Sequence, residues 1–119
     1  MSQAPRLFTA GSANIDLTFR IPGPPRPGVT EICPYALGFG GKGANQAVQA
    51  ARLGGSVVFL GKVGDDPFGP AIVDQLRREG IDPRHVRPAG GMATGTAVIL
   101  VDPSGQNTII THAGPNVAL

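Results

Sequence analysis

The spacing of apolar and polar residues predicts several strands along the chain. The short apolar run Leu7–Ala10 is typical of a buried strand. Between residues 15 and 21 apolar and polar side chains alternate with a period of two, which predicts a half-exposed strand. The proline-rich segment 22–28 predicts a loop, because proline fixes φ and lacks an amide donor. Val29–Leu37 is a weaker strand candidate, and Pro34 favours a place at the edge of a sheet.

Two later segments have the spacing of helices. Residues 43–53 are rich in alanine and predict a helix with a small-residue face that packs close to a sheet. Gly54 suits the position just after that helix. Asp66 and Pro67 have the character of a capping residue and a first helical residue, and they predict a second helix that ends at Gly80.

The order of these elements indicates the fold class. Val57–Leu60 predicts a buried strand between the two helices. Thr96–Val101 and Asn107–Thr111 flank the turn residues 102–105 and predict a hairpin. Strands that alternate with helices indicate an α/β core, and the remaining strands indicate a second, antiparallel sheet.

Composition narrows the classes of function. The 119 residues suffice for one domain, and 41% apolar residues are typical of a soluble globular protein. The net charge of +2 is scattered, and five Phe with one Tyr offer few stacking surfaces, so no nucleic-acid partner is expected. Cys33, the single cysteine, fits a reducing compartment. No apolar run approaches the ~20 residues of a membrane span, so we expect a cytoplasmic protein without a membrane partner.

The segment Gly38–Asn45 carries the clearest chemical signal. Its glycines predict a turn that lets a ligand approach the backbone closely, directly before a helix N-terminus. Amides and the helix dipole at that end favour oxygen-rich ligands, and Lys42 adds positive charge. Asn45 offers a donor and an acceptor on one side chain, which matches a pair of sugar hydroxyls.

A second pair of polar residues follows the first strand. Asn14 and Asp16 are separated by one residue, so they share a face of an extended segment. Such a pair can hold vicinal hydroxyls through several hydrogen bonds. On the residues alone, the more ordinary interpretation is favoured, in which Asn14 is a turn residue and Asp16 a solvated charge.

Two nucleotide-binding motifs compete with this interpretation. Gly38, Gly40 and Gly43 fit the spacing of a dinucleotide fingerprint, but the strand candidate before them contains Pro34, and no acidic residue follows Leu60. A phosphate-binding P-loop is excluded because glycine, and not Ser or Thr, follows Lys42. A metal pair of His85 and His112 is not expected either, since neither has a ligand-forming neighbour.

Five motifs together resemble a known family. They occur in this order: Gly11–Asp16, Gly38–Ala47, Gly61–Asp66, Thr94–Ile99 and His112–Asn116. From about Leu7 to Leu119 the chain resembles the N-terminal part of ribokinase-like members of the PfkB carbohydrate kinase family. The resemblance implies that residues 1–119 are the first part of one kinase domain, with the start of a mostly parallel core sheet and a small antiparallel lid at about 15–37 and 94–113.

The resemblance also implies which residues serve the site. Those that match sugar-binding positions are Asn14, Ile15, Asp16, Gly41, Lys42, Gly43, Ala44 and Asn45. Ala97 and Ile99 match lid positions over the sugar, and Gly40 with Gly41 matches a hinge. The complete enzyme is expected to convert ribose to ribose 5-phosphate with ATP, Mg²⁺ and a monovalent cation. Other sugar or nucleoside kinases of the family are the alternative.

The catalytic and nucleotide-binding motifs of the family are not found among these 119 residues. The catalytic Asp of a Gly-Ala-Gly-Asp motif, the nucleotide pocket and the magnesium-associated acidic motif lie further along in family members. We therefore expect no catalytic residue and no metal ligand among the 119 residues, no kinase activity from them alone, and poor folding in isolation. A competing hypothesis is a non-catalytic interaction module that forms a homodimer through the lid sheet.

Overall fold

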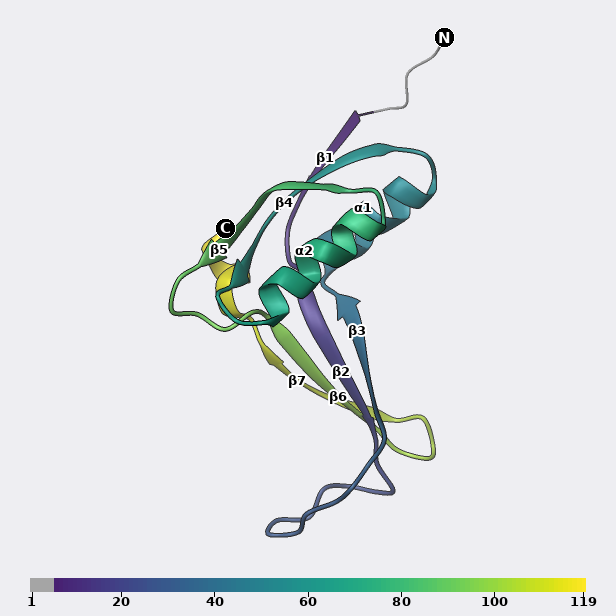
Figure 1. Ribbon diagram of the computed structural model, residues 1–119. Coiled ribbons are helices and arrows are strands. Elements are labelled where there is room, and N and C mark those ends of the chain that lie inside the picture. The colour runs from purple at the N-terminus through teal and green to yellow at the C-terminus, as the bar shows by residue number, and fades with distance from the viewer. Residues whose placement is uncertain (1–5) are drawn as a thin grey trace.

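The computed structural model describes residues 6–119, which form two parts of different shape (Figure 1). The body contains a parallel sheet of three strands in the order β1 (Arg6–Ala10), β4 (Ser56–Gly64) and β5 (Asp82–Ala89). A second sheet extends away from the body, and the molecule measures 60 × 34 × 19 Å along its principal axes. Residues 14–20, 35–40, 96–101 and 107–112 form this protruding sheet.

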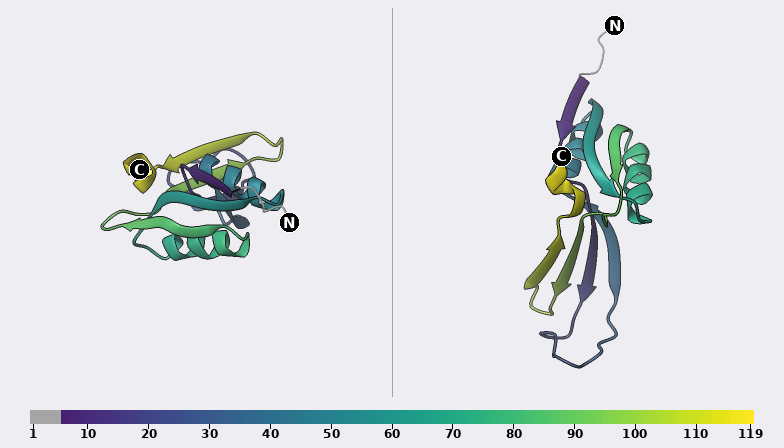
Figure 2. Two further views of the ribbon diagram at one scale, coloured as in Figure 1. Left: turned by 90° about the horizontal axis from the view of Figure 1, so that it is seen from above. Right: turned by 90° about the vertical axis from the view of Figure 1, so that its left-hand side faces the viewer.

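Two helices pack on the body sheet. They are α1 (Lys42–Arg52) and α2 (Phe68–Arg78), close to the predicted ranges. A short 3-10 helix, η1 (Gly114–Ala118), lies on the side of the sheet opposite to α2 (Figure 2). Within residues 6–119, no helix combines the length and the apolar character that crossing a membrane requires.

The core of the body lies between β4 and the two helices. Phe59 of β4 is fully buried, and it belongs to one cluster with Ala47 of α1 and Leu76 of α2. The alanine face of α1 lets the helix approach the sheet closely, as its sequence predicted. Asp66 accepts a hydrogen bond from the amide of Gly69 at 3.2 Å, so its predicted capping role is confirmed.

The protruding sheet has four strands in the order β3-β2-β6-β7. Their bounds are β2 (Asn14–Arg20), β3 (Tyr35–Gly40), β6 (Thr96–Val101) and β7 (Asn107–His112). The predicted hairpin of β6 and β7 is confirmed, and β2 with β3 forms a second antiparallel pair. The two central strands, β2 and β6, pair in parallel because the chain completes the body before it returns. The α/β fold class is therefore confirmed.

Three local predictions need correction. Leu7–Ala10 forms a strand that is not buried: Phe8 is 70% exposed, because β1 is an edge strand and its face opposite the helices is bare. The segment 29–34 forms no strand, and β3 begins only at Tyr35. Gly38 and Gly40 belong to β3 and not to a turn, because both lie in register opposite β2. The strand β5 was not singled out from the sequence.

Candidate functional site

The expected site residues meet where the protruding sheet joins the body. Strand β2 begins at Asn14, and β3 ends at Gly40 directly opposite it. Only Gly41 separates β3 from α1, so the first turn of that helix lies beside the root of the sheet (Figure 1). Two segments that are far apart in sequence, 14–16 and 40–45, are thereby brought together.

Gly41 makes this junction possible. Its φ of +95° is a conformation that L side chains rarely adopt. A Cβ at this position would also lie 2.5 Å from the carbonyl oxygen of Ser12 and 2.8 Å from the Cα of Ala13. The sharp change from strand to helix, packed against the Ser12–Ala13 backbone, therefore requires glycine.

The start of α1 is held by the loop that follows β1. The hydroxyl oxygen of Ser12 accepts a hydrogen bond from the Lys42 amide at 3.1 Å, and the Ser12 carbonyl accepts one from the Ala44 amide at 2.9 Å. A Cβ on Gly43 would lie 2.7 Å from the Cα of Gly11, so the two backbones touch. Because Ser12 occupies two of the first amides, the expectation of a free helix N-terminus is met only in part.

Asp16 is a carboxylate with unused acceptor capacity. Its side chain is partly buried and lies against Gly40, where a Cβ would come within 2.8 Å of the Asp16 Cγ. Its neighbours across the two adjacent strands, Gly38 and Ala97, are small. Among residues 6–119 no donor hydrogen-bonds this carboxylate, and burial raises its pKa. A carboxylate with small neighbours and no protein donor suits a ligand that donates hydroxyl protons.

Asn14 lies on the same face of β2 as Asp16, two residues closer to the body. Its Oδ1 accepts a hydrogen bond of 2.7 Å from Nδ2 of Asn116, which belongs to η1. No local sequence pattern predicts a role for Asn116. The only signal was its place in the motif 112–116, because the contact spans 102 positions of the chain.

A second polar anchor holds the root of β6. Thr94 is fully buried, and its hydroxyl donates to Oδ1 of Asp66 at 2.5 Å while its amide donates to Oδ2 at 2.8 Å. The same hydroxyl accepts a hydrogen bond of 2.9 Å from the amide of Gly64, the last residue of β4. Burial alone would raise the pKa of Asp66, but the hydrogen bonds from Thr94 and Gly69 outweigh it and lower that pKa.

The remaining residues that were expected to bind the sugar differ in how far they are exposed to solvent. Lys42 and Asn45 are exposed on the first turn of α1. Ala97 lies opposite Asp16 on β6, and Ile99 follows on the same face, opposite Thr18. The side chain of Ile15 is fully buried in the core, so any contact it makes with a ligand is limited to its backbone.

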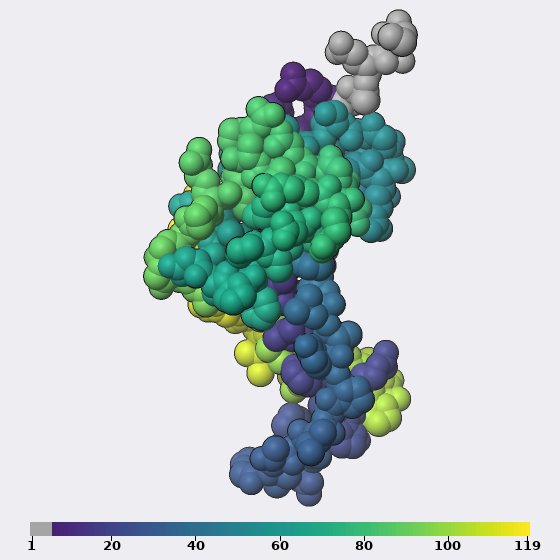
Figure 3. Space-filling model, viewed as in Figure 1, coloured from purple at the N-terminus to yellow at the C-terminus, as the bar shows by residue number. Residues whose placement is uncertain are grey.

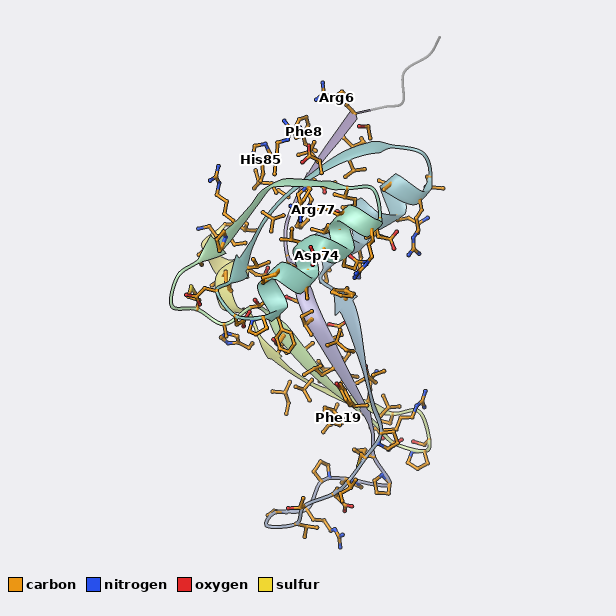
Figure 4. The ribbon with its side chains drawn as sticks, in the orientation of Figure 1. Arg6, Phe8, Phe19, Asp74, Arg77 and His85 are labelled. Atoms are coloured by element: carbon orange, nitrogen blue, oxygen red, sulfur yellow. The ribbon has the colours of Figure 1, made fainter. Side chains whose placement is uncertain are left out.

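Cavity size alone would not locate this site. One hollow of about 410 Å³ lies between α2 and β5, beside Asp74 and Arg77, which Figure 4 labels. Another of about 410 Å³ lies at the far end of the protruding sheet, around Cys33. Neither is lined by Asp16. In residues 6–119 no three His, Cys, Asp or Glu side chains gather in a way that could hold a metal ion.

The dinucleotide interpretation fails on the structure. Its fingerprint requires a turn between a parallel strand and a helix. Gly38 and Gly40 instead lie inside β3, an antiparallel edge strand of the protruding sheet.

The chain is similar in sequence and in fold to known ribokinases. The chain is 40% identical to a ribokinase of Haemophilus influenzae over 111 residues, which cover 92% of this chain and 36% of that protein. It is also 40% identical to a Mus musculus ribokinase over 118 residues, covering 98% of this chain and 36% of the relative.

A solved structure, Arabidopsis thaliana ribokinase complexed with ribose and ATP, superimposes with a TM-score of 0.89 at 37% identity, over 96% of this chain and 38% of that one. The chain thus spans little more than a third of the length of these relatives. The family model for pfkB carbohydrate kinases matches residues 4–119. The chain belongs to the pfkB family of carbohydrate kinases.

Proposed function

We propose that this chain forms the sugar-binding part of an ATP-dependent carbohydrate kinase. The observation that carries the proposal is the part-buried carboxylate of Asp16, which lacks a donor among residues 6–119, shares a face of β2 with Asn14 and has small residues as its neighbours across the strands. Because no protein donor occupies this partly buried carboxylate, its oxygens remain available to a ligand that donates hydrogen bonds. Sugar hydroxyls supply such donors, and the first turn of α1 adds Lys42 and Asn45 at the same junction.

The protruding sheet acts as a lid in this proposal. Residues 15–37 and 94–113 form the lid, and Gly40 with Gly41 is the hinge where it joins α1. Ala97 and Ile99 face the same side as Asp16 and come to lie over the sugar. Closure of the lid excludes water, so that a phosphoryl group passes to the sugar and not to solvent.

Ribose is the proposed sugar, with ribose 5-phosphate as the product of the complete enzyme. The support comes from the relatives, which are named ribokinases, and from the structure described as a complex with ribose and ATP. ATP, Mg²⁺ and a monovalent cation belong to the same proposal. Among residues 6–119 no three His, Cys, Asp or Glu side chains gather to hold a metal ion, and neither a catalytic base nor a metal ligand is proposed in them. The cytoplasm is the proposed location.

Calorimetric titration with D-ribose tests the site. Asp16→Asn removes the charge while it keeps the size of the side chain, and it is expected to weaken ribose binding by about tenfold or more. Asp74→Asn, on the exposed face of α2, makes the same chemical change away from the site and is expected to bind as the unchanged protein does. Equal affinities in all three proteins would refute the assignment of Asp16.

A second candidate function is dimerisation through the protruding sheet. Tyr35, Leu37 and Ile110 share one face of that sheet and are 61%, 44% and 62% exposed. Exposed apolar area of this kind on a sheet favours association with another copy. Ile110→Asp is expected to give a monomer in light scattering, while Ile109→Asp, on the opposite face, leaves the dimer intact. A monomer at every concentration would rule the dimer out.

A further inference from the structure

The side-chain amide of Asn116 has an orientation that the backbone dictates. The amide of Ala13 donates a hydrogen bond of 3.1 Å to its Oδ1, and its Nδ2 donates one of 2.9 Å to the carbonyl oxygen of Ala113. A backbone N–H can only donate, and a backbone carbonyl can only accept. Neither contact survives if the oxygen and nitrogen of Asn116 are exchanged, so the orientation is fixed.

The fixed amide in turn orients Asn14. The Nδ2 group of Asn116 also donates to Oδ1 of Asn14 at 2.7 Å. The opposite orientation of Asn14 would set two donor groups against each other. Gly95 makes room for the pair, because a Cβ at that position would overlap both Nδ2 of Asn116 and Oδ1 of Asn14.

The oriented Asn14 has an unused donor group. Its Nδ2 makes no hydrogen bond to any of the residues 6–119, and its side chain lies on the same face of β2 as the Asp16 carboxylate. The face therefore presents one donor beside one acceptor. A turned Asn14 would instead place an amide oxygen beside the carboxylate, and two acceptors would then compete for the protons of the ligand.

We propose that Asn116 is a positioning residue, which acts on the ligand only through Asn14. It holds Asn14 with its amide protons available, so that the site pairs a donor with the Asp16 acceptor. This pair matches neighbouring hydroxyls, one of which accepts from Asn14 while the other donates to Asp16. The inference rests on the proposed sugar site, and it deepens that proposal by assigning the donor and acceptor roles.

The backbone around Asn116 packs tightly against neighbouring segments. The residue lies in η1, next to the buried Gly114 and Pro115. Gly114 has a φ of +56°, and a Cβ there would lie 2.5 Å from the Ala93 carbonyl oxygen, so η1 packs tightly on the segment that leads into β6. One short helix thus contacts the roots of both central strands of the protruding sheet.

The variant Asn116→Asp tests the orientation. A carboxylate still accepts from the Ala13 amide, but it cannot donate to Asn14, so Asn14 is expected to turn and donate to Asp at position 116 instead. D-Ribose affinity should fall about tenfold. Asn107→Asp, at the exposed start of β7, adds the same charge elsewhere and should leave the affinity unchanged.

Hydrogen exchange of the side-chain amides, followed by NMR without sugar, separates this inference from the proposed function. In the unchanged protein the Asn116 protons should be protected and the Asn14 protons should exchange rapidly, and Asn116→Asp should make the Asn14 protons protected. Asn14 protons that are protected in both proteins would overturn the inference. The expected exchange pattern without any ribose binding would leave the orientation standing and refute the sugar site.

If Asn116→Asp does not fold, Asn14→Asp provides the second test. It keeps the acceptor for Asn116 but removes the free donor, so Asn116 should stay protected while ribose affinity falls about tenfold. Undiminished ribose affinity in Asn14→Asp would contradict the donor role.

Discussion

The body and the protruding sheet are stabilised in different ways. In the body, helices cover one face of the sheet, and Phe59 and Leu76 are 0% and 1% exposed. Within residues 6–119 no helix covers the protruding sheet beyond its root, and its large apolar side chains there are half-buried or exposed. The space-filling view shows the sheet extending below the body (Figure 3). Apolar burial thus stabilises the body, and far less of it is available to the sheet.

Polar contacts add to the apolar burial of Ile15 at the root of the protruding sheet. The carboxylate of Asp66 holds Thr94, two residues before β6, and Asn116 holds Ala13 and Asn14 at the start of β2. Such directional contacts fix the direction in which the strands leave the body. The candidate site lies at this boundary, where a ligand can contact both parts at once.

The largest expected effect is the loss of unfolding free energy when an aromatic ring is removed from the body, compared with the loss when one is removed from the protruding sheet. Phe59→Ala removes a fully buried ring and should lower the free energy of unfolding by about 3–5 kcal/mol. Phe19, which stacks on Tyr35 with ring centroids 5.6 Å apart, is only half-buried (Figure 4). Phe19→Ala should cost about 1 kcal/mol. Equal losses in urea unfolding would contradict the contrast between the parts.

The hinge should be next in sensitivity. Gly41→Ala combines a left-handed backbone with contact against Ser12, and it should cost about 2–4 kcal/mol and weaken ribose binding. Gly54 has the same φ of +95° but no atom within 4 Å of its added Cβ. Gly54→Ala should therefore cost about 1 kcal/mol. Thermal unfolding of the pair measures how much of the loss comes from crowding at the junction.

The polar anchor of β6 should show a smaller effect that depends on pH. Thr94→Val removes the hydroxyl bonded to Asp66 and Gly64, and it should cost about 1–3 kcal/mol at neutral pH. The folded state lowers the pKa of Asp66 from 3.8, so its contribution is present above that value and is lost as the pH falls through the lower, folded pKa.

Urea unfolding at neutral pH and below about pH 4 checks this dependence. In Thr94→Val the part of the acid sensitivity that belongs to Asp66 should shrink, while Asp74→Asn should keep it. An unchanged acid profile in Thr94→Val would show that the hydroxyl does not stabilise the Asp66 carboxylate.

The smallest effect, a gain in stability, is expected at Asp16. Burial raises its pKa, so the ionised carboxylate opposes folding at neutral pH, and this opposition disappears as the pH falls below the ordinary value of 3.8. Asp16→Asn should therefore be slightly more stable than the unchanged protein at neutral pH but not in acid. A loss of stability at neutral pH would mean that the carboxylate serves the fold and not a ligand.

The sequence predicted those parts of the fold that depend on local patterns. The alternation at residues 15–21 and the alanine spacing of 43–53 correspond to β2 and α1 within one or two residues. The strand β5 was overlooked because its residues, Asp82–Ala89, include two prolines and three basic side chains and show no apolar alternation. Gly38 and Gly40 suggested a turn, but pairing with β2 draws them into a strand.

The candidate site was predictable only in part, for a related reason. The positions of Asn14, Asp16 and Gly41 follow from motifs that are short and local in sequence. The role of Asn116 depends on contacts with residues more than a hundred positions earlier, and the role of Thr94 depends on Asp66, 28 positions earlier. No spacing rule within one segment reveals such partners.

Titration of the isotopically labelled chain with D-ribose, followed by amide NMR, tests the central claim most directly. If the boundary between body and protruding sheet holds the sugar, the amides that shift should cluster at residues 14–16 and 41–45, with weaker changes at Ala97 and Ile99. Ribose-induced shifts confined to the hollow between α2 and β5, or the absence of any shift in the folded protein, would contradict it.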